Sequence, residues 1–189
     1  GATDLGGMEC PDLFHIIADD GTSHWVLGAS MDGWGAGSLG TYAYWIGNWD
    51  GTRFVTDNLR PQWLDHGYDW YAAVTWPSAD SPQNVRHAVA WMNNWKYAAR
   101  HVPTLDTDGY NCQYSVVREI RLCRQPGGWY SLLSAPEPVL ATSLLSQKSL
   151  GDVNVNGRRV LDVTTEAYVL TTDIAWTNAT NVGIEVLRS

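Results

Sequence analysis

Two carboxylates stand in surroundings that could support proton transfer. Glu9 lies in the stretch Gly6–Phe14 (GGMECPDLF), between small or apolar neighbours and two residues before a proline. Such a glutamate is either a solvated loop residue or a carboxylate held in a partly apolar pocket, and burial of the second kind suits a group that acts as a general acid. Asp69, in the aromatic run Tyr68–Trp76 (YDWYAAVTW), is the second candidate.

The cysteines and the remaining aspartates carry weaker signals. Cys10, Cys112 and Cys123 form no Cys-x-x-Cys pair and have no histidine at ligand spacing, which disfavours a zinc site. A disulfide between Cys112 and Cys123 stays open beside the alternative of buried free thiols. Several aspartates stand beside glycine, asparagine, serine or another aspartate, where the side chain caps its own backbone in a turn; they are Asp19, Asp20, Asp50, Asp57 and Asp80.

The composition favours an uncharged partner. Eleven Trp and nine Tyr against two Phe supply many rings that combine an apolar face with a polar tip, a type common in cores, interfaces and sugar-stacking platforms. The formal net charge of −8 disfavours binding to nucleic acid or to an anionic membrane, because both need clustered Lys and Arg. No apolar run approaches the roughly 18 residues of a membrane span.

Short strands are expected through the first two thirds of the chain, and no helix. Thr41–Phe54 alternates aromatic and small residues and then reaches Asp50-Gly51, which predicts a hairpin. An all-β fold of antiparallel strands follows, as a sandwich, a barrel or propeller blades. The other predicted strands are His24–Ser30, Trp70–Trp76, Arg86–Met92, Val116–Cys123 and Trp129–Ser134.

A change of composition near Ala135 predicts a domain boundary. The run APEPVLATSLLSQKS contains two prolines and small polar residues, which is typical of a connector. Further strands are predicted beyond it, at Asp152–Val155, Arg159–Val163, Tyr168–Trp176 and Gly183–Leu187. Because a β domain of about 40 residues seldom folds alone, we expect the second unit to be incomplete.

Four motifs taken together resemble one enzyme family. They are MECPDLF (Met8–Phe14), YDWYAAVTW (Tyr68–Trp76), AWMNNWKYA (Ala90–Ala98) with the following Val102-Pro103-Thr104, and VVREIRL (Val116–Leu122). In this order they resemble glycoside hydrolase family 32, which comprises levanases, inulinases, invertases and related fructosyltransferases. The tail, Asp173–Ser189, resembles the start of that family's C-terminal sandwich, and Gly109–Leu122 is similar to levan fructotransferases.

The resemblance implies a five-bladed β-propeller followed by a β-sandwich. Residues 1–135 would be the C-terminal part of the catalytic propeller, residues 136–149 a linker and residues 150–189 the start of the sandwich. Glu9, in the family's Glu-Cys-Pro motif, would be the general acid/base, and Trp91 would line the sugar subsite. Asp69 and Tyr71, which alternate onto the same strand face, and Trp34, in a glycine-rich loop near the outer subsite, complete the expected substrate-binding set.

The mechanism that the resemblance implies is retaining. A carboxylate attacks the anomeric carbon of a fructosyl unit while the acid protonates the leaving oxygen, so the two carboxyl groups would lie about 5–5.5 Å apart. The substrate would be a fructan, such as levan or inulin, or sucrose, and no metal or organic cofactor is implied. Because polymers are met outside the cell, we expect a secreted protein.

The sequence departs from the family at the nucleophile. The family places that aspartate in a Trp-Met-Asn-Asp-Pro-like motif and a second aspartate in Arg-Asp-Pro, and neither motif occurs here. We therefore expect an internal segment of a longer enzyme, inactive alone, whose N-terminal blades carry the nucleophile. Two blades of a ring would also leave apolar faces open, which indicates a missing partner. A non-catalytic carbohydrate-binding β module is the alternative.

Overall fold

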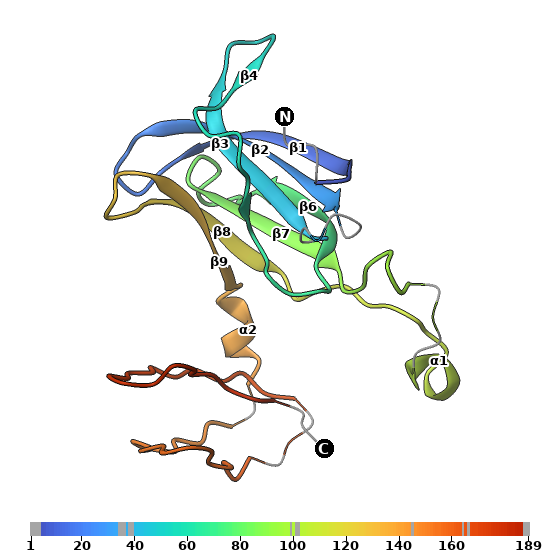
Figure 1. Cartoon of the computed structure of the whole chain (residues 1–189), viewed down its shortest axis with the longest axis vertical. Helices are drawn as coiled ribbons and strands as arrows, with labels where there is room; N and C mark the ends of the chain where they lie inside the picture. The colour runs from blue at the N-terminus through green and yellow to red at the C-terminus, as the bar shows by residue number, and fades with distance from the viewer. Residues whose placement is uncertain are drawn as a thin grey trace. The chain divides into compact units, whose positions relative to one another are not determined.

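The chain folds into two compact units. The computed structural model describes residues 5–33, 37, 40–98, 100, 103–144, 146–163, 165 and 167–186. The first unit spans Gly1–Pro138 and the second spans Val139–Ser189. Strands dominate the first unit, which confirms the all-β class (Figure 1).

The first sheet is an antiparallel meander that begins at the candidate acid. Its order is β1-β2-β3-β4, and β5 pairs with β3 on the same side as β4. The predicted turn at Asp50-Gly51 joins β3 to β4, and the Asp50 carboxylate accepts hydrogen bonds from the backbone N–H groups of Thr52 and Arg53. The bounds are β1 Gly7–Ile17, β2 Ser23–Asp32, β3 Tyr42–Trp49, β4 Phe54–Val55 and β5 Gln62–Trp63.

The second sheet repeats the meander with four strands in sequence order, β6-β7-β8-β9. Every one of these strands was predicted, with ends that differ by one or two residues. Two successive antiparallel meanders, the first with β5 added beside β3, have the form of propeller blades, while the five-blade count stays a prediction. The bounds are β6 Tyr71–Pro77, β7 Val85–Trp91, β8 Arg118–Arg124 and β9 Tyr130–Pro136.

The main core lies between the two sheets, which face each other in Figure 1. Alternate residues of each strand fill it, among them Tyr42 and Tyr44 from β3, Ile120 and Leu122 from β8, and the completely buried Trp70. A second cluster lies on the opposite face of the first sheet, where Trp45 and Trp63 pack with smaller apolar residues. Both Trp therefore fill space in the packing of the first sheet.

Two short helices correct the expectation of none. They are α1, Pro103–Thr107, and α2, Val139–Thr142, and both are close to a single turn. A proline begins α1, where a missing N–H costs nothing. Neither helix among the described residues has the length and apolar character needed to span a membrane.

The described residues of the second unit contain no strand, so the strands predicted there are not formed. The described residues of the four predicted runs are mostly exposed, and the described chain offers no partner strand to satisfy their backbone groups. Leu187, at the end of the last run, lies outside the described residues. The sandwich stays a prediction.

Candidate active site

Two bulged edge strands, one from each sheet, bring Glu9 and Tyr71 together. β1 and β6 are the first strands of their sheets and lie against each other. The pairing register shifts between Glu9 and Asp12 in β1 and between Tyr71 and Val74 in β6. Each shift contains a residue other than glycine at positive φ, Cys10 at 49° and Ala72 at 50°. Bulges redirect neighbouring side chains, so each bulge helps to aim the residue just before it.

The Tyr71 phenol donates a hydrogen bond to the Glu9 carboxylate. Tyr71 is 2% exposed, and burial, followed by the hydrogen bond to Glu9 and the charges of Glu9 and Asp32, raises the pKa of its phenol. The phenol therefore stays protonated over the range in which enzymes work and remains a donor. The two residues are 62 positions apart in the sequence.

Glu9 itself is exposed, so of the two settings that the sequence left open the apolar pocket is not the one observed. The physical reason is its place at the start of an edge strand, where only β2 pairs with β1 and the neighbouring Met8 is also exposed. The contact with Tyr71 is what distinguishes Glu9 from a freely solvated residue. The proton-transfer role of Glu9 stays a prediction.

An aromatic row leads away from the Glu9–Tyr71 pair. Trp91, at the end of β7, is the register partner of Tyr71, and their ring centroids lie 6.4 Å apart at an interplanar angle of 74°. The next ring is Trp95, 5.2 Å from Trp91 and 61% exposed. Going outward from the Glu9–Tyr71 pair, the row passes through the Trp91 ring to the more exposed Trp95 ring. Such a surface suits the apolar face of a sugar.

Trp95 was not predicted as a site residue, although the Trp-Met-Asn-Asn-Trp spacing contained the signal. Its turn is held by Asn94, which is completely buried, donates to the Tyr68 carbonyl oxygen (2.7 Å) and accepts from the Lys96 N–H (3.0 Å). Asn93 accepts from the Asn94 N–H at 2.9 Å. The asparagines therefore fix the turn that displays the two Trp.

Asp69 does not lie on the strand face with Tyr71. Asp69 stands in the bend before β6 and is exposed to solvent. The expectation that Asp69 and Tyr71 alternate along one strand is therefore wrong. Partial desolvation of its carboxyl group nevertheless raises the pKa of Asp69. Trp34, the remaining predicted binding residue, lies outside the described residues.

A polar network that was not predicted joins the two sheets next to the bulges. Thr75 of β6 donates a hydrogen bond to the Asp12 carboxylate, and the Arg86 Nε donates to the Thr75 Oγ1 at 2.8 Å. The Arg86 Nη2 lies 3.8 Å from the Asp12 Oδ2, and its guanidinium stacks 4.2 Å from the Phe14 ring centroid. Arg86 is only 9% exposed, and burial lowers its pKa without removing its charge.

The cysteines form no disulfide. Cys10 and Cys112 are exposed and Cys123 is half-buried, so the open disulfide is not formed and burial of all three thiols is wrong. Among the described residues, no group of three or more His, Cys, Asp or Glu side chains is placed to hold a metal ion.

Comparison with known proteins gives a consistent family match. The model of the glycosyl hydrolases family 32 N-terminal domain matches residues 2–136. A levanbiose-producing levanase of Geobacillus stearothermophilus is 45% identical over 186 residues, which cover 97% of this chain and 46% of the levanase. An extracellular exo-inulinase of Aspergillus niger is 29% identical over 167 residues, which cover 80% of this chain and 30% of the inulinase.

The solved structures that resemble the chain agree with these relatives. A fructofuranosidase of Schwanniomyces occidentalis complexed with fructose aligns with a TM-score of 0.55 and 26% identity, over 68% of this chain and 25% of that one. The chain thus spans less than half the length of each of these relatives.

Proposed function

The chain belongs to glycosyl hydrolase family 32, and we propose that it is part of an enzyme that transfers a fructosyl unit from levan, inulin or sucrose. The contact of the Tyr71 phenol with the Glu9 carboxylate, beside the Trp91 ring, carries the proposal. It holds a carboxylate from the Glu-Cys-Pro motif next to an aromatic surface. The names of the levanase and inulinase relatives support a fructan as substrate.

Glu9 acts as general acid and then as general base. In the first step a carboxylate nucleophile bonds to the anomeric carbon of the fructosyl unit, and the bond to the leaving oxygen breaks as that oxygen takes the Glu9 proton. In the second step Glu9 removes a proton from the attacking hydroxyl, which displaces the nucleophile. Water as attacker completes hydrolysis, and a sugar hydroxyl completes transfer.

The remaining site residues hold the sugar and the acid. Tyr71 fixes the Glu9 carboxylate through its protonated phenol. Trp91 offers an aromatic face next to Tyr71, and Asp69 accepts hydrogen bonds from sugar hydroxyls at the mouth of the site. Trp34 belongs to the outer subsite.

The nucleophile comes from the rest of the polypeptide. The 189 residues of the chain lack the family's nucleophile motif. The levanase relative is more than twice as long as the region that matches. The apolar cluster around Trp45 and Trp63 lies on the face of the first sheet away from the second sheet. This face could pack against a preceding blade of the propeller. We propose five blades in all, with residues 1–135 as the C-terminal part of the propeller.

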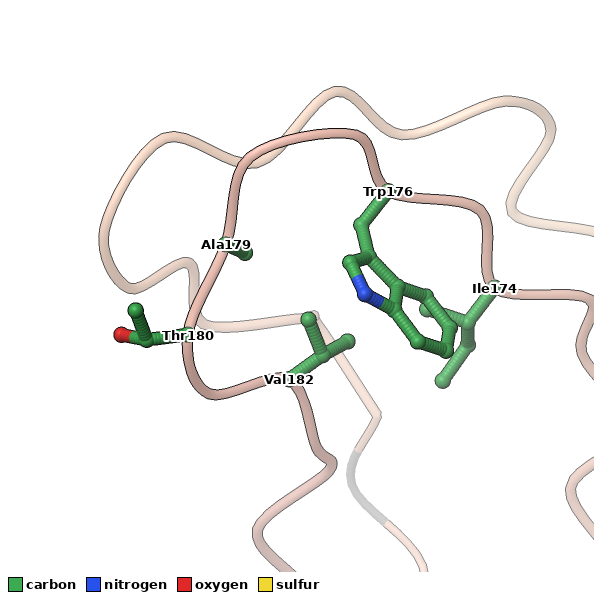
Figure 2. Close-up of a pocket in the computed structure, with 5 residues that line it drawn as sticks. All are labelled: Ile174, Trp176, Ala179, Thr180 and Val182. Atoms are coloured by element: carbon green, nitrogen blue, oxygen red, sulfur yellow. The ribbon is translucent and has the colours of Figure 1, made fainter.

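Residues 136–149 are the linker and residues 150–189 begin a sandwich. Figure 2 shows the side chains of Ile174, Trp176 and Val182 pointing toward one another across one bend of the second unit. They line a hollow of about 300 Å³, and Trp176 is 62% exposed. An incomplete β unit leaves the apolar side chains of its inner face exposed, and these side chains have that arrangement.

Replacement of Glu9 in the complete polypeptide tests the proposal. We expect Glu9→Gln to lower turnover of levan, inulin and sucrose by about 10²- to 10⁴-fold, because the proton donor is lost. Glu119→Gln, which alters an exposed pair with Arg121 on β8, is the matched control and retains activity. Unchanged turnover in Glu9→Gln contradicts the role of Glu9. Proton NMR of the first fructose released tests retention, and an inverted anomer rules it out.

Culture fractionation tests the proposed location. The similarity to an extracellular exo-inulinase supports secretion, and we expect the native protein in the medium and not in washed cells.

Non-catalytic sugar binding is the second candidate, and the exposure of Glu9 and Trp95 favours it. It predicts that the complete polypeptide binds levan or inulin without releasing any sugar. Release of fructose or of fructose oligomers that is lost in Glu9→Gln excludes this candidate.

A further inference from the structure

A hollow of about 560 Å³ opens in the first unit, away from the Glu9–Tyr71 pair. Its walls come from β3, from the segment between β4 and β5, and from the turn that leads into β9. Its volume falls within the range of about 300–1,000 Å³ that is typical of small-molecule sites.

The register separates this hollow from the candidate active site. Glu9 pairs with Ser30, and Ser30 pairs with Tyr42 at the start of β3. The wall residues on β3 run from Tyr44 to Asn48, which lie two to six positions further along the strand, or roughly 7 to 20 Å at about 3.3 Å per residue. Glu9 and the hollow therefore serve different parts of any bound polymer.

Aromatic rings form one side of the hollow. Trp129 lies in its lining and is 55% exposed. The neighbouring Tyr130 ring lies 4.1 Å from the His24 ring, centroid to centroid. An exposed indole beside a fixed pair of rings is a surface on which the C–H face of a sugar can stack.

Hydrogen bonds between the two sheets hold this surface in place. Gln62 donates through Nε2 to the Tyr130 carbonyl oxygen at 2.8 Å and accepts from the Tyr44 hydroxyl at 3.0 Å. The Tyr44 hydroxyl in turn accepts from the Leu132 N–H at 3.0 Å. The first sheet is thus joined to β9 directly behind the aromatic surface, and a ligand meets a wall that is already formed.

The other side offers polar groups that remain available to a ligand. Within the described part of the chain, the side chains of Asn48, Asp57 and Arg60 have no hydrogen-bond or ion-pair partner, and all three line the hollow. One carboxylate and one guanidinium balance each other in charge, and the amide is neutral. This set can donate to and accept from hydroxyl groups without selecting for a charged ligand.

We propose that this hollow is a second carbohydrate-binding site, which holds a neutral polyhydroxylated chain away from the centre of reaction. The proposal rests on the proposed function in one respect, that the chain bound here is a further segment of the fructan substrate. Trp129 provides the stacking surface, and Asn48, Asp57 and Arg60 bind hydroxyl groups. Occupation of this site would raise the local concentration of polymer at the enzyme.

Retention in native gels that contain polysaccharide tests the site. The complete polypeptide carries Glu9→Gln, so that the polymer is not consumed, and is run with levan, inulin or dextran. We expect Trp129→Ala to weaken the apparent affinity for levan by about 3- to 10-fold, the effect of losing one aromatic contact. Trp76→Ala is the matched control, because Trp76 is an exposed ring on β6 that stacks on His87 and lies outside the hollow.

Asp57→Asn provides a second variant with little risk to folding, because Asp57 is exposed. Weaker retention in both variants, with retention of Trp76→Ala unchanged, supports the site. Retention of Trp129→Ala and Asp57→Asn equal to that of the parent overturns it. Equal retention on dextran and levan supports a general glycan site and removes the link to fructan.

The activities separate this proposal from the proposed function. With Glu9 intact, we expect Trp129→Ala to hydrolyse sucrose normally and to show a higher KM for levan. A polypeptide that hydrolyses no fructan or sucrose but still binds levan through Trp129 contradicts the proposed function and leaves the second site standing. Equal KM values for levan in the variant and the parent count against the second site alone.

Discussion

The phenol of Tyr71 reaches across from the second sheet and donates its proton in a hydrogen bond to the Glu9 carboxylate of the first sheet. The orientation of the candidate acid therefore depends on how the two sheets pack. Each partner stands at a bulge on an edge strand, so a change in either strand register would separate them. Tyr71 is a positioning residue for Glu9 in the proposed reaction.

Tyr71→Phe should lower kcat/KM for sucrose by about 10- to 100-fold, because a hydrogen bond to a charged group contributes on the order of 1.5–3 kcal/mol. The ring and its packing remain, so the thermal midpoint should change little. Steady-state kinetics on the complete polypeptide make the measurement. Tyr110→Phe, at an exposed position, serves as control. A Tyr71→Phe rate within twofold of the parent would show that Glu9 needs no support from this phenol.

Trp91→Ala should raise KM more than it lowers kcat. The Trp91 ring packs edge to face on Tyr71 and leads to Trp95, so its loss removes stacking surface and leaves the carboxylate in place. A change of about 2- to 10-fold is expected from one aromatic contact. Trp91→Phe should recover part of the effect, whereas a purely structural role would lower the thermal midpoint without this split between KM and kcat.

Arg86→Met should destabilise the protein by about 3 kcal/mol, because it leaves the Asp12 carboxylate at the sheet interface without its cation. Chemical denaturation measures the loss. Adding Asp12→Asn should restore part of it, since the unpaired charge is then removed. Arg121→Met, which breaks an exposed pair with Glu119, should cost less than about 1 kcal/mol. Equal losses in the two single variants would contradict a special role for the buried network.

The strands were predictable where a local pattern sets them. Period-two alternation predicted β2, β3 and β6 to β9, and Asp50-Gly51 predicted the turn between β3 and β4. β1 was not predicted, because Gly6-Gly7 and Pro11 hide a strand whose alternation is broken by a bulge. The runs beyond residue 150 show the converse, since they carry a strand pattern but the described residues there form no strand with which they could pair.

The candidate site was predictable only in part, because its contacts join distant segments. The motifs identified Glu9, Tyr71 and Trp91, and the structure brings these three together. No local sequence pattern predicts the hydrogen bond from Thr75 to Asp12, which lies 63 positions earlier. The exposure of Glu9 was likewise hidden from sequence, because burial at an edge strand depends on what lies beyond that edge.

Asp69→Asn should weaken substrate binding while it leaves stability unchanged or slightly higher at neutral pH. Desolvation raises the pKa of Asp69 above its ordinary value of 3.8. The folded protein then holds this proton more tightly than the unfolded chain does, so the stability contribution is present below pH 3.8 and is lost as pH rises through the raised pKa. Asn does not titrate and removes that loss.

Denaturation at pH 4 and pH 7, with KM for sucrose and inulin at pH 7, makes both measurements. A lower free energy of unfolding at pH 7 combined with an unchanged KM would assign Asp69 to the structure and not to the substrate.

Alkaline pH should weaken the packing of the two sheets through Tyr44. Burial raises the pKa of Tyr44 from 10.0 to about 12, and its hydroxyl links Gln62 to the Leu132 N–H. Because the folded protein keeps the proton that the unfolded chain releases near pH 10, the stabilising contribution is complete below pH 10 and is lost as pH rises through about 12. Free energies of unfolding from pH 8 to 12 should therefore fall above pH 10, and less steeply in Tyr44→Phe than in the parent. A parallel fall in both proteins would show that other groups, and not the Tyr44 phenol, cause the alkaline loss.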